Sequence, residues 1–285
     1  MAKPLLVNLG CGDRFHRDWL NLDLTSCAPE VTACDLRHGI PLGDNTADAC
    51  YSSHILEHLR PCDGHAFIAE QCRVLKPGGV IRVAIPDLET ICRNYIQHLD
   101  RLLAGDAQAE ADYDWTMLEL YDQTTRDKPG GEMARRLLAG EVSNRDYAVS
   151  RQGPMIEAFF EQAAGNVQAD EPRPLLSRLR PGKLLAKLRR AGSRFDVRMI
   201  AGREALEAYD AGLFRATGEV HHAMYDQFSL ARLLQAAGFE SPRVMAADAS
   251  AIPDFVEFQL DTNSDGRVVK PDSLFMEARK PRASV

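Results

Sequence analysis

The sequence predicts an α/β fold that is Rossmann-like, with a mostly parallel sheet, helices on both faces and a helical insertion after strand five. Two observations lead to this prediction. Short apolar runs alternate with turn and helix signals over the first third of the chain, and the same pattern returns near His221 after a long polar stretch. The expected division is a core from 1–99, a mainly helical insertion or cap from 100–217, and a second part of the core from 218–285.

Each strand is expected where an apolar run has the length of a buried strand and a turn signal follows it. The predicted strands of the first part cover 5–9, 19–24, 31–34, 47–52 and 80–85, and Pro86 ends the last of them. In the second part, strands are expected at 244–246, 255–260 and 274–278. Strands separated by helical connections imply parallel pairing.

Helices are expected where apolar residues recur at helical spacing. Residues 65–75 show this spacing, and the run from Lys76 to Gly79 should end the helix and turn the chain. Residues 88–103 form a long amphipathic pattern, and the last helix should begin after Asp226 and stop at Gly238. Within the insertion, helices are predicted at 115–121 and 133–138, the second closed by Gly140.

Composition and charge exclude several classes of protein. Of the 285 residues, 45% are hydrophobic and 26% are charged, which is ordinary globular usage and excludes a disordered or fibrous chain. No apolar run approaches the ~18–20 residues of a membrane-spanning helix, and the N-terminus lacks a signal-peptide core. A cytoplasmic location is therefore expected.

One basic segment stands out against an acidic chain. Residues 173–203 contain ten Lys or Arg and a single acid, giving +9, whereas the whole chain carries −7, so the rest carries −16. Nucleic-acid binding is not expected, because the basic surface of such a protein should dominate. The segment could dock on the acidic body, or it could contact an anionic membrane surface and place the protein at the inner membrane face. The sequence does not indicate an oligomeric state.

Two features that could suggest metal binding are interpreted otherwise. The seven cysteines lie in the first third, in odd number and without metal-ligand spacing, so they are expected to be reduced thiols and mostly small core residues. Residues 261–272 resemble a calcium loop, but Asp272 stands where Glu is usual and Pro271 lies beside it. A polar hairpin turn is the better interpretation, and no metal site is predicted.

The residues that could bind a ligand fall at the ends of successive strands. Gly10-Cys11-Gly12 follows the first strand, where glycine lets a ligand approach the backbone. Asp23 closes the second strand, Asp35 closes the third, and His54 follows the fourth. Since the carboxyl ends of parallel strands meet at one edge, a ligand lying there would meet them in order. The third glycine of a dinucleotide motif is missing, which counts against NAD.

These residues resemble a family when taken together. The run from Val7 to Gly12 resembles motif I of class I S-adenosylmethionine-dependent methyltransferases, and residues 35–49 resemble their adenine-binding stretch and fourth strand. Similar segments follow at 54–59, 73–79 and 229–239. The combination is most similar to a branch of predicted methyltransferases of surface-polysaccharide biosynthesis. Two departures are Asn8, where an acid is common, and the short gap from Gly12 to Asp23, which implies a truncated first helix.

The resemblance implies S-adenosylmethionine as cofactor and a role for each matching residue. The backbone of the glycine turn would contact the methionine part of the cofactor near Asn8, and Asp23 would hold the ribose. Asp35 and Leu36 would flank the adenine, and Ser53 and His54 would lie beside the sulfonium and the acceptor. The implied cofactor-binding set is Asn8, Gly10, Cys11, Gly12, Asp23, Asp35, Leu36 and Ser53.

The implied reaction is methyl transfer, with O-methylation of a sugar or glycan hydroxyl as the first hypothesis. A hydroxyl acceptor must lose its proton, and a histidine base is typically worth ~10²–10⁴ in rate. His54 is the preferred base, with His58 and His221 as substitutes, and Asp87 and Glu57 are the carboxylate alternatives. The other hypotheses are a small-metabolite or nitrogen acceptor, and a non-catalytic scaffold of this fold in a glycan assembly complex. The insertion is expected to form the acceptor side of the site.

Overall fold

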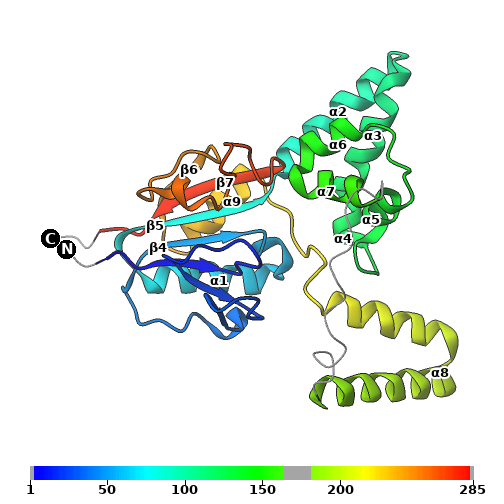
Figure 1. The fold of residues 1–285 in the computed structure, drawn as a ribbon, viewed down its shortest axis with the longest axis horizontal. Helices are drawn as coiled ribbons and strands as arrows, with labels where there is room; N and C mark the ends of the chain where they lie inside the picture. The colour runs from blue at the N-terminus through cyan, green and yellow to red at the C-terminus, as the bar shows by residue number, and fades with distance from the viewer. Residues whose placement is uncertain (1–2, 164–180, 283–285) are drawn as a thin grey trace.

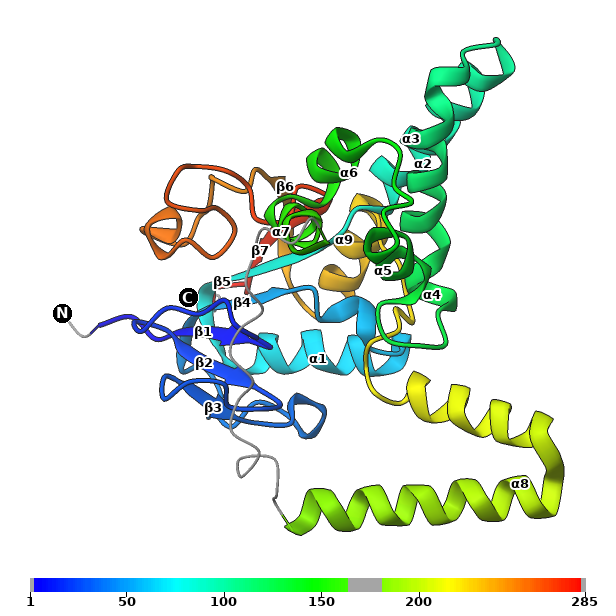
Figure 2. The same ribbon diagram turned by 45° about the vertical axis from the view of Figure 1, so that its right-hand side comes forward.

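A seven-stranded sheet organises the chain in the computed structural model, which describes residues 3–163 and 181–282 and, for residues 181–188, the backbone alone. The strand order is β3-β2-β1-β4-β5-β7-β6, with β1 to β5 parallel and β7 antiparallel to both of its neighbours (Figures 1 and 2). The strands are β1 (Leu6–Leu9), β2 (Leu20–Asp23), β3 (Val31–Ala33), β4 (Ala47–Ser53), β5 (Leu75–Pro86), β6 (Glu240–Met245) and β7 (Ser273–Arg279).

The predicted fold class is confirmed, with two corrections to its elements. The segment from Lys76 to Gly79 was expected to form a turn before the strand, but it is part of β5. This strand already begins at Leu75, which pairs with Ala47 before a register shift. The strand predicted at 255–260 is instead the 3-10 helix η6 (Phe255–Phe258). Phe255 packs on the face of the sheet, whereas the sheet edge is already occupied by β6, so this apolar run has no strand to pair with.

Side chains alternate along the strands to build two cores. On β5, Ile81, Val83 and Ile85 point to the face covered by α1 (Pro61–Val74) and α9 (Gln227–Ala236). Val80 and Ala84 point to the other face, where η6 and the rest of the 246–272 segment provide the cover. The predicted start of α9 is confirmed, because Asp226 and Ser229 form a capping box.

The connection between β1 and β2 forms turns and contains no helix in the described residues. The buried amide of Asn8 ties this connection down, since its Nδ2 donates to the backbone oxygen of Arg14 at 3.0 Å and to Oδ1 of Asn21 at 3.2 Å. The short spacing in the sequence therefore leads to a compact loop at the position of the expected truncated helix.

The chain leaves the sheet after β5 and builds a helical layer with its own core (Figures 1 and 2). Trp115, Met133 and Leu137 are buried there. The 88–103 prediction coincides with α2, and the 133–138 prediction lies within α5. The helices are α2 (Leu88–Leu103), η3 (Ala107–Ala109), α3 (Glu110–Met117), the π-helix η4 (Leu118–Asp122), α4 (Gln123–Thr125), α5 (Gly131–Leu138), α6 (Arg145–Gln152) and α7 (Pro154–Ala163).

The last helix of the insertion, α8 (Pro181–Arg215), stands apart from the sheet in both views (Figure 2). Gly202 has a non-helical backbone that divides α8 into two arms, and an ion pair joins Arg194 to Asp210 across them. Residues 173–180 of the basic segment lie outside the described residues. Among the described helices, none is both long and apolar enough to cross a membrane.

The two metal-like features of the sequence have structural explanations. Thr262 pairs with Val268 across an antiparallel bridge, and the N–H of Asn263 donates to the oxygen of Arg267, which confirms the polar hairpin turn. All seven cysteines are free thiols. The expectation that they are mostly core residues is wrong, because only Cys11 and Cys50 are buried.

Candidate functional site

A tight glycine turn follows β1 at the carboxyl edge of the sheet. The N–H groups of Gly10 and Cys11 both donate to the oxygen of Leu22, so the turn is fixed to β2. Gly10 and Gly12 have φ of 64° and 54°, in the region that favours glycine. A Cβ on Gly10 would lie 2.2 Å from Cδ1 of Ile55, whereas a Cβ on Gly12 would meet nothing within 4 Å. Gly12 therefore borders open space, which fits the approach of a ligand to the backbone.

These two glycines make a matched pair for a stability test. Gly12→Ala should lower the free energy of unfolding by ~1–2 kcal/mol, the cost of a left-handed backbone for an L-residue. Gly10→Ala should cost ~1–3 kcal/mol more, because Ile55 must also move in a packed core. Urea denaturation of both variants checks this difference. Equal losses would mean that Ile55 moves freely and that packing does not require Gly10.

Asp23, at the end of β2, accepts a hydrogen bond from the glycine turn. Its Oδ2 accepts from the N–H of Gly12 at 2.9 Å, and its Oδ1 accepts from the N–H of Thr25 at 3.1 Å. Each carboxylate oxygen can accept a second hydrogen bond. The geometry is therefore compatible with the predicted ribose contact and gives the carboxylate a second role in fixing the turn.

The remaining predicted cofactor residues differ in how free their side chains are. The Asn8 amide nitrogen is engaged with the β1–β2 connection, and burial raises the pKa of the Cys11 thiol to about 12, which keeps it neutral. Asp35 caps the 3-10 helix η1 (Leu36–His38), and its hydrogen-bonded ion pair with Arg37 holds the pKa of that carboxyl well below its usual range. Leu36 packs against the core, and Ser53 is half-buried at the end of β4.

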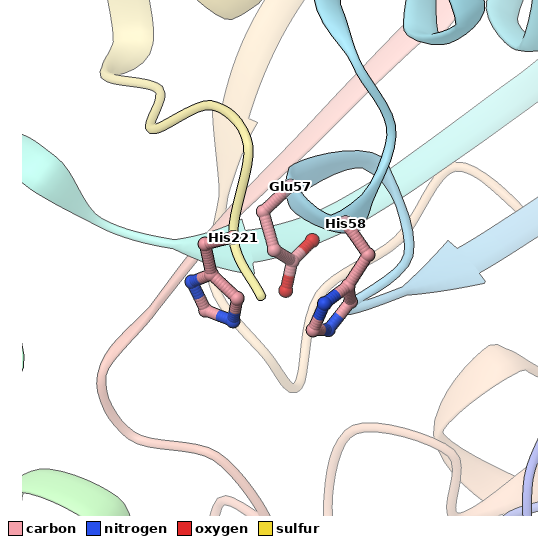
Figure 3. A group of neighbouring side chains, drawn as sticks. All are labelled: Glu57, His58 and His221. Atoms are coloured by element: carbon pink, nitrogen blue, oxygen red, sulfur yellow. The ribbon is translucent and has the colours of Figure 1, made fainter. Parts of the chain in front are cut away.

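A buried polar cluster lies just beyond β4 (Figure 3). Glu57 and His58 belong to the 3-10 helix η2 (Leu56–His58), and His221 lies just after the insertion. The rings of His58 and His221 stand edge to face with centroids 4.6 Å apart, and one ligand atom from each of the three residues lies within 4.8 Å of the others. Glu57 is 1% exposed, and its carboxylate lies between the two rings (Figure 3).

Backbone hydrogen bonds bring the distant His221 to this place. The N–H of His221 donates to the oxygen of Gln123 at 2.9 Å, and the N–H of His222 donates to the oxygen of Glu57 at 2.7 Å. The first bond comes from the insertion and the second from η2, so the cluster forms where the insertion meets the sheet. The sequence suggested each histidine separately, but the fold brings His58 and His221 together.

His54 lies beside the cluster in an unusual conformation. Its φ is 54°, and its N–H donates to the oxygen of Ala84 on β5 at 2.8 Å. Its Nε2 shares a hydrogen bond with Oγ of Ser273 at 2.8 Å, and its Nδ1 lies 3.2 Å from Oε1 of Glu57. Burial, together with the charge of Lys270, lowers the pKa of His54 to about 3, so the imidazole is neutral at pH 7. A non-glycine residue held at positive φ often marks a functional site.

Burial also keeps the other two imidazoles neutral. It lowers the pKa of His221 to about 3 and lowers the pKa of His58, in both cases against the opposing charge of Glu57. Neutral imidazoles offer a lone pair to a proton, a hydrogen-bond donor or a metal ion.

The carboxylate of Asp87 is engaged in helix capping. Its Oδ1 accepts from the N–H of Glu89 at 3.0 Å, and its Oδ2 accepts from the hydroxyl of Thr90 at 2.5 Å. These bonds start α2, and the N–H of Asp87 also donates to the oxygen of Asp272. The catalytic role suggested for Asp87 therefore stays a prediction, with a structural role already visible.

Sequence reasoning missed several polar residues near the cluster. Ser273 contacts His54, and the half-buried Lys270 faces Glu57 and Asp272, with its pKa lowered by burial. From the insertion, Glu119 pairs with Arg151 at 3.1 Å, and burial raises the pKa of Glu119 to about 7. None of these residues belongs to a recognisable sequence motif. Their place near the cluster depends on contacts between segments that are distant in sequence.

The strand order, the glycine turn and the polar edge together define a Rossmann-like protein in which a ligand could lie across the carboxyl ends of β1, β2 and β4. Residues 16–83 match the family model described as a methyltransferase domain. This match covers less than half of the chain and indicates methyltransferase activity with S-adenosylmethionine as the cofactor. A comparison with curated protein sequences finds no match.

Solved structures give distant similarities. An S-adenosylmethionine-dependent methyltransferase from Mesorhizobium loti is 14% identical, with a TM-score of 0.36 and coverage of 98% of this chain and 92% of that chain. A Haloferax volcanii complex of the Trm112 methyltransferase activator with a protein assigned as a methyltransferase gives 11% identity, a TM-score of 0.38 and coverage of 98% and 84%. At these values, no acceptor or partner carries over to this chain.

Proposed function

We propose that the protein methylates a hydroxyl group of a sugar or glycan. The observation that supports a hydroxyl acceptor is the neutral, buried histidine cluster at the carboxyl end of β4, with His54 hydrogen-bonded to Ser273. A hydroxyl is a poor nucleophile until its proton is removed, and imidazole is the side chain that most often removes it. The sugar class rests on the resemblance of the motifs described above.

In the proposed mechanism, the chain positions the reactants and accepts a proton. When bound, S-adenosylmethionine supplies an electrophilic methyl group on its sulfonium. The glycine turn and Asp23 would hold the cofactor at the sheet edge, and His54 would receive the acceptor proton either directly or through the hydroxyl of Ser273. The methyl group would pass to the acceptor oxygen as its bond to sulfur breaks and a neutral thioether leaves, and exclusion of water would favour this transfer.

The insertion, residues 100–217, is proposed to form the acceptor side of the site. Gln123 accepts from the N–H of His221, and Gly153 lies against Pro271 and Val269, so the helical layer contacts the loop beside Lys270. The π-helix η4 contributes Glu119 near Asp272. A π-helical turn is uncommon and often lies at a functional site, which supports an acceptor-facing role for η4.

A second prediction concerns the cofactor. Asp23→Ala should weaken S-adenosylmethionine binding by ~1–3 kcal/mol, because a carboxylate contact is lost and the Gly12 turn loses its anchor. Asp23→Asn, which keeps one acceptor oxygen, should lose less. Calorimetric titration of both variants with S-adenosylmethionine measures the difference. Unchanged affinity in Asp23→Ala would refute the placement of the cofactor.

The acceptor class is tested by methyl transfer from labelled S-adenosylmethionine to a panel of sugars, nucleotide-activated sugars, amines and small hydroxylated metabolites. The proposal expects label on a sugar oxygen. Label on nitrogen or on a small metabolite would favour the alternative enzyme function. Cofactor binding with no transfer to any acceptor class, including glycan extracts, would favour the non-catalytic scaffold.

The basic segment 173–203 keeps two proposed roles, docking on the acidic body or contact with an anionic membrane surface. Its described side chains begin at Arg189, and this part of α8 exposes Phe195, Met199 and Ile200. A basic helix with exposed apolar residues suits a membrane surface, where lipid-linked glycans are found. The proposed methyl transfer does not depend on which role holds.

A further inference from the structure

The cluster of Glu57, His58 and His221 leaves more polar atoms unpartnered than a buried site normally does. Both carboxylate oxygens of Glu57 and the Nδ1 atoms of His58 and His221 are buried without a hydrogen-bond partner. The contact between His54 and Glu57 at 3.2 Å lacks hydrogen-bond geometry, so it does not satisfy the carboxylate. Buried polar atoms are nearly always paired, and an unpaired carboxylate is especially costly.

We propose that Glu57, His58 and His221 bind a divalent transition-metal ion. One ligand atom from each residue lies within 4.8 Å of the others, which allows a single ion to contact all three. Two imidazoles and one carboxylate are the donor set of many catalytic zinc sites, and also of facial sites that bind iron(II). Both kinds of site keep at least one position open for water or substrate.

The surroundings of the cluster suit such an ion. The unpartnered atoms of Glu57, His58 and His221 are shielded from water and lie close together, so an ion could meet all three residues. His54 lies 3.2 Å from Glu57 without a hydrogen bond, so the carboxylate stays available to an ion. Lys270 opposes a cation here, but Asp272 faces Lys270 and offsets its charge.

The site lies where the proposed reaction needs it. η2 follows β4, beside the edge at which Gly12 and Asp23 meet the cofactor, and His221 arrives with the insertion. An ion with an open position could bind the acceptor hydroxyl and lower its pKa. That catalytic role rests on the proposed function, whereas the metal site itself stands on the cluster alone.

The test measures metal binding without any acceptor. The protein is purified, treated with a chelator, dialysed and titrated calorimetrically with Zn²⁺ and, separately, Mn²⁺. One equivalent of at least one of these ions should bind, and Glu57→Gln, His58→Asn and His221→Asn should each weaken binding by ~100-fold or more. His222→Asn is the matched control, because His222 is the next residue and lies outside the cluster.

Two further measurements keep the result interpretable. The bound ion should raise the melting temperature of the wild type and of His222→Asn, but not that of the cluster variants. Co²⁺ should bind without thiolate-to-metal absorption, which excludes the free cysteines as ligands. Absence of tight binding, or equal binding by His221→Asn and His222→Asn, would overturn the proposal. S-adenosylmethionine affinity and methyl transfer, measured on the same samples, show separately whether the proposed function holds.

Discussion

Replacing His54 with alanine is expected to slow methyl transfer by about 10²-fold, the lower end of the usual contribution of a general base. The reason for the lower end is that burial lowers the pKa of His54 to about 3, which makes the imidazole a weak base at neutral pH. Affinity for S-adenosylmethionine should stay nearly unchanged, since the cofactor residues on β1 and β2 are untouched. Single-turnover rates with the identified acceptor measure the loss.

The backbone of His54 requires a second variant. Its φ of 54° is unfavourable for alanine, whereas asparagine tolerates this region well. His54→Asn therefore removes the imidazole with little backbone strain, and it should lose as much rate as His54→Ala. His65→Ala, on the exposed side of α1, is the control and should keep full activity. Full activity in His54→Asn would move the proton acceptor to another residue.

Replacing Arg82 with methionine should lower the free energy of unfolding by ~3–5 kcal/mol, the largest stability effect predicted for this protein. Arg82 is fully buried on β5, and it forms ion pairs with Asp261 at 2.8 Å and with Glu277 at 2.9 Å. It also donates to three backbone oxygens and stacks on Phe255. Without it, two buried carboxylates lose their ion-pair partner.

Denaturation curves of three variants separate the pair energy from simple loss of packing. Arg93→Met removes an exposed arginine paired with Glu89 and should cost less than ~1 kcal/mol. The triple variant Arg82→Met, Asp261→Asn, Glu277→Gln should recover much of the stability that Arg82→Met loses, because no buried charge is left unpaired. If the triple variant is no more stable than the single one, the ion pairs are not the cause.

The loss from Arg82→Met should also depend on pH. Burial raises the pKa of Asp261 even in the wild type, and Arg82 opposes that shift. An acid whose pKa is higher in the folded state than in the unfolded state loses stability as pH rises between the two values. The variant widens that window, so its deficit should grow from acid pH toward neutral pH.

Local sequence patterns were sufficient for the regular elements. The 88–103 periodicity gave α2, the Asp226 signal gave the start of α9, and five apolar runs gave the five parallel strands. These patterns are informative because a helix or strand that buries one face has apolar residues at the spacing of its own geometry. The glycine turn with Asp23 was predictable for the same reason, since both residues adjoin the strands that position them.

Contacts between distant segments were not predictable. Residues 255–260 have the apolar pattern of a strand, and the local sequence does not show that β6 occupies the edge of the sheet. In the structure this run packs on the face of the sheet instead. In the sequence, Arg82 has the pattern of an exposed residue in a strand. In the structure it is buried and paired with Asp261 and Glu277. The hydrophobic periodicity and the composition of a segment do not indicate which residues of another segment it will contact.

The sequence by itself predicted the fold class, the edge of the sheet expected to bind the cofactor, and the candidate histidines of this protein. Only the tertiary structure decided which of them meet. No metal was expected from the sequence because Glu57 and His58 are far from His221 along the chain, with the insertion between them. After the insertion, the chain passes next to η2. The backbone N–H groups of His221 and His222 donate to the oxygens of Gln123 and Glu57, and these bonds fix His221 beside the cluster. The cluster depends on this packing, and packing between distant segments leaves no local pattern.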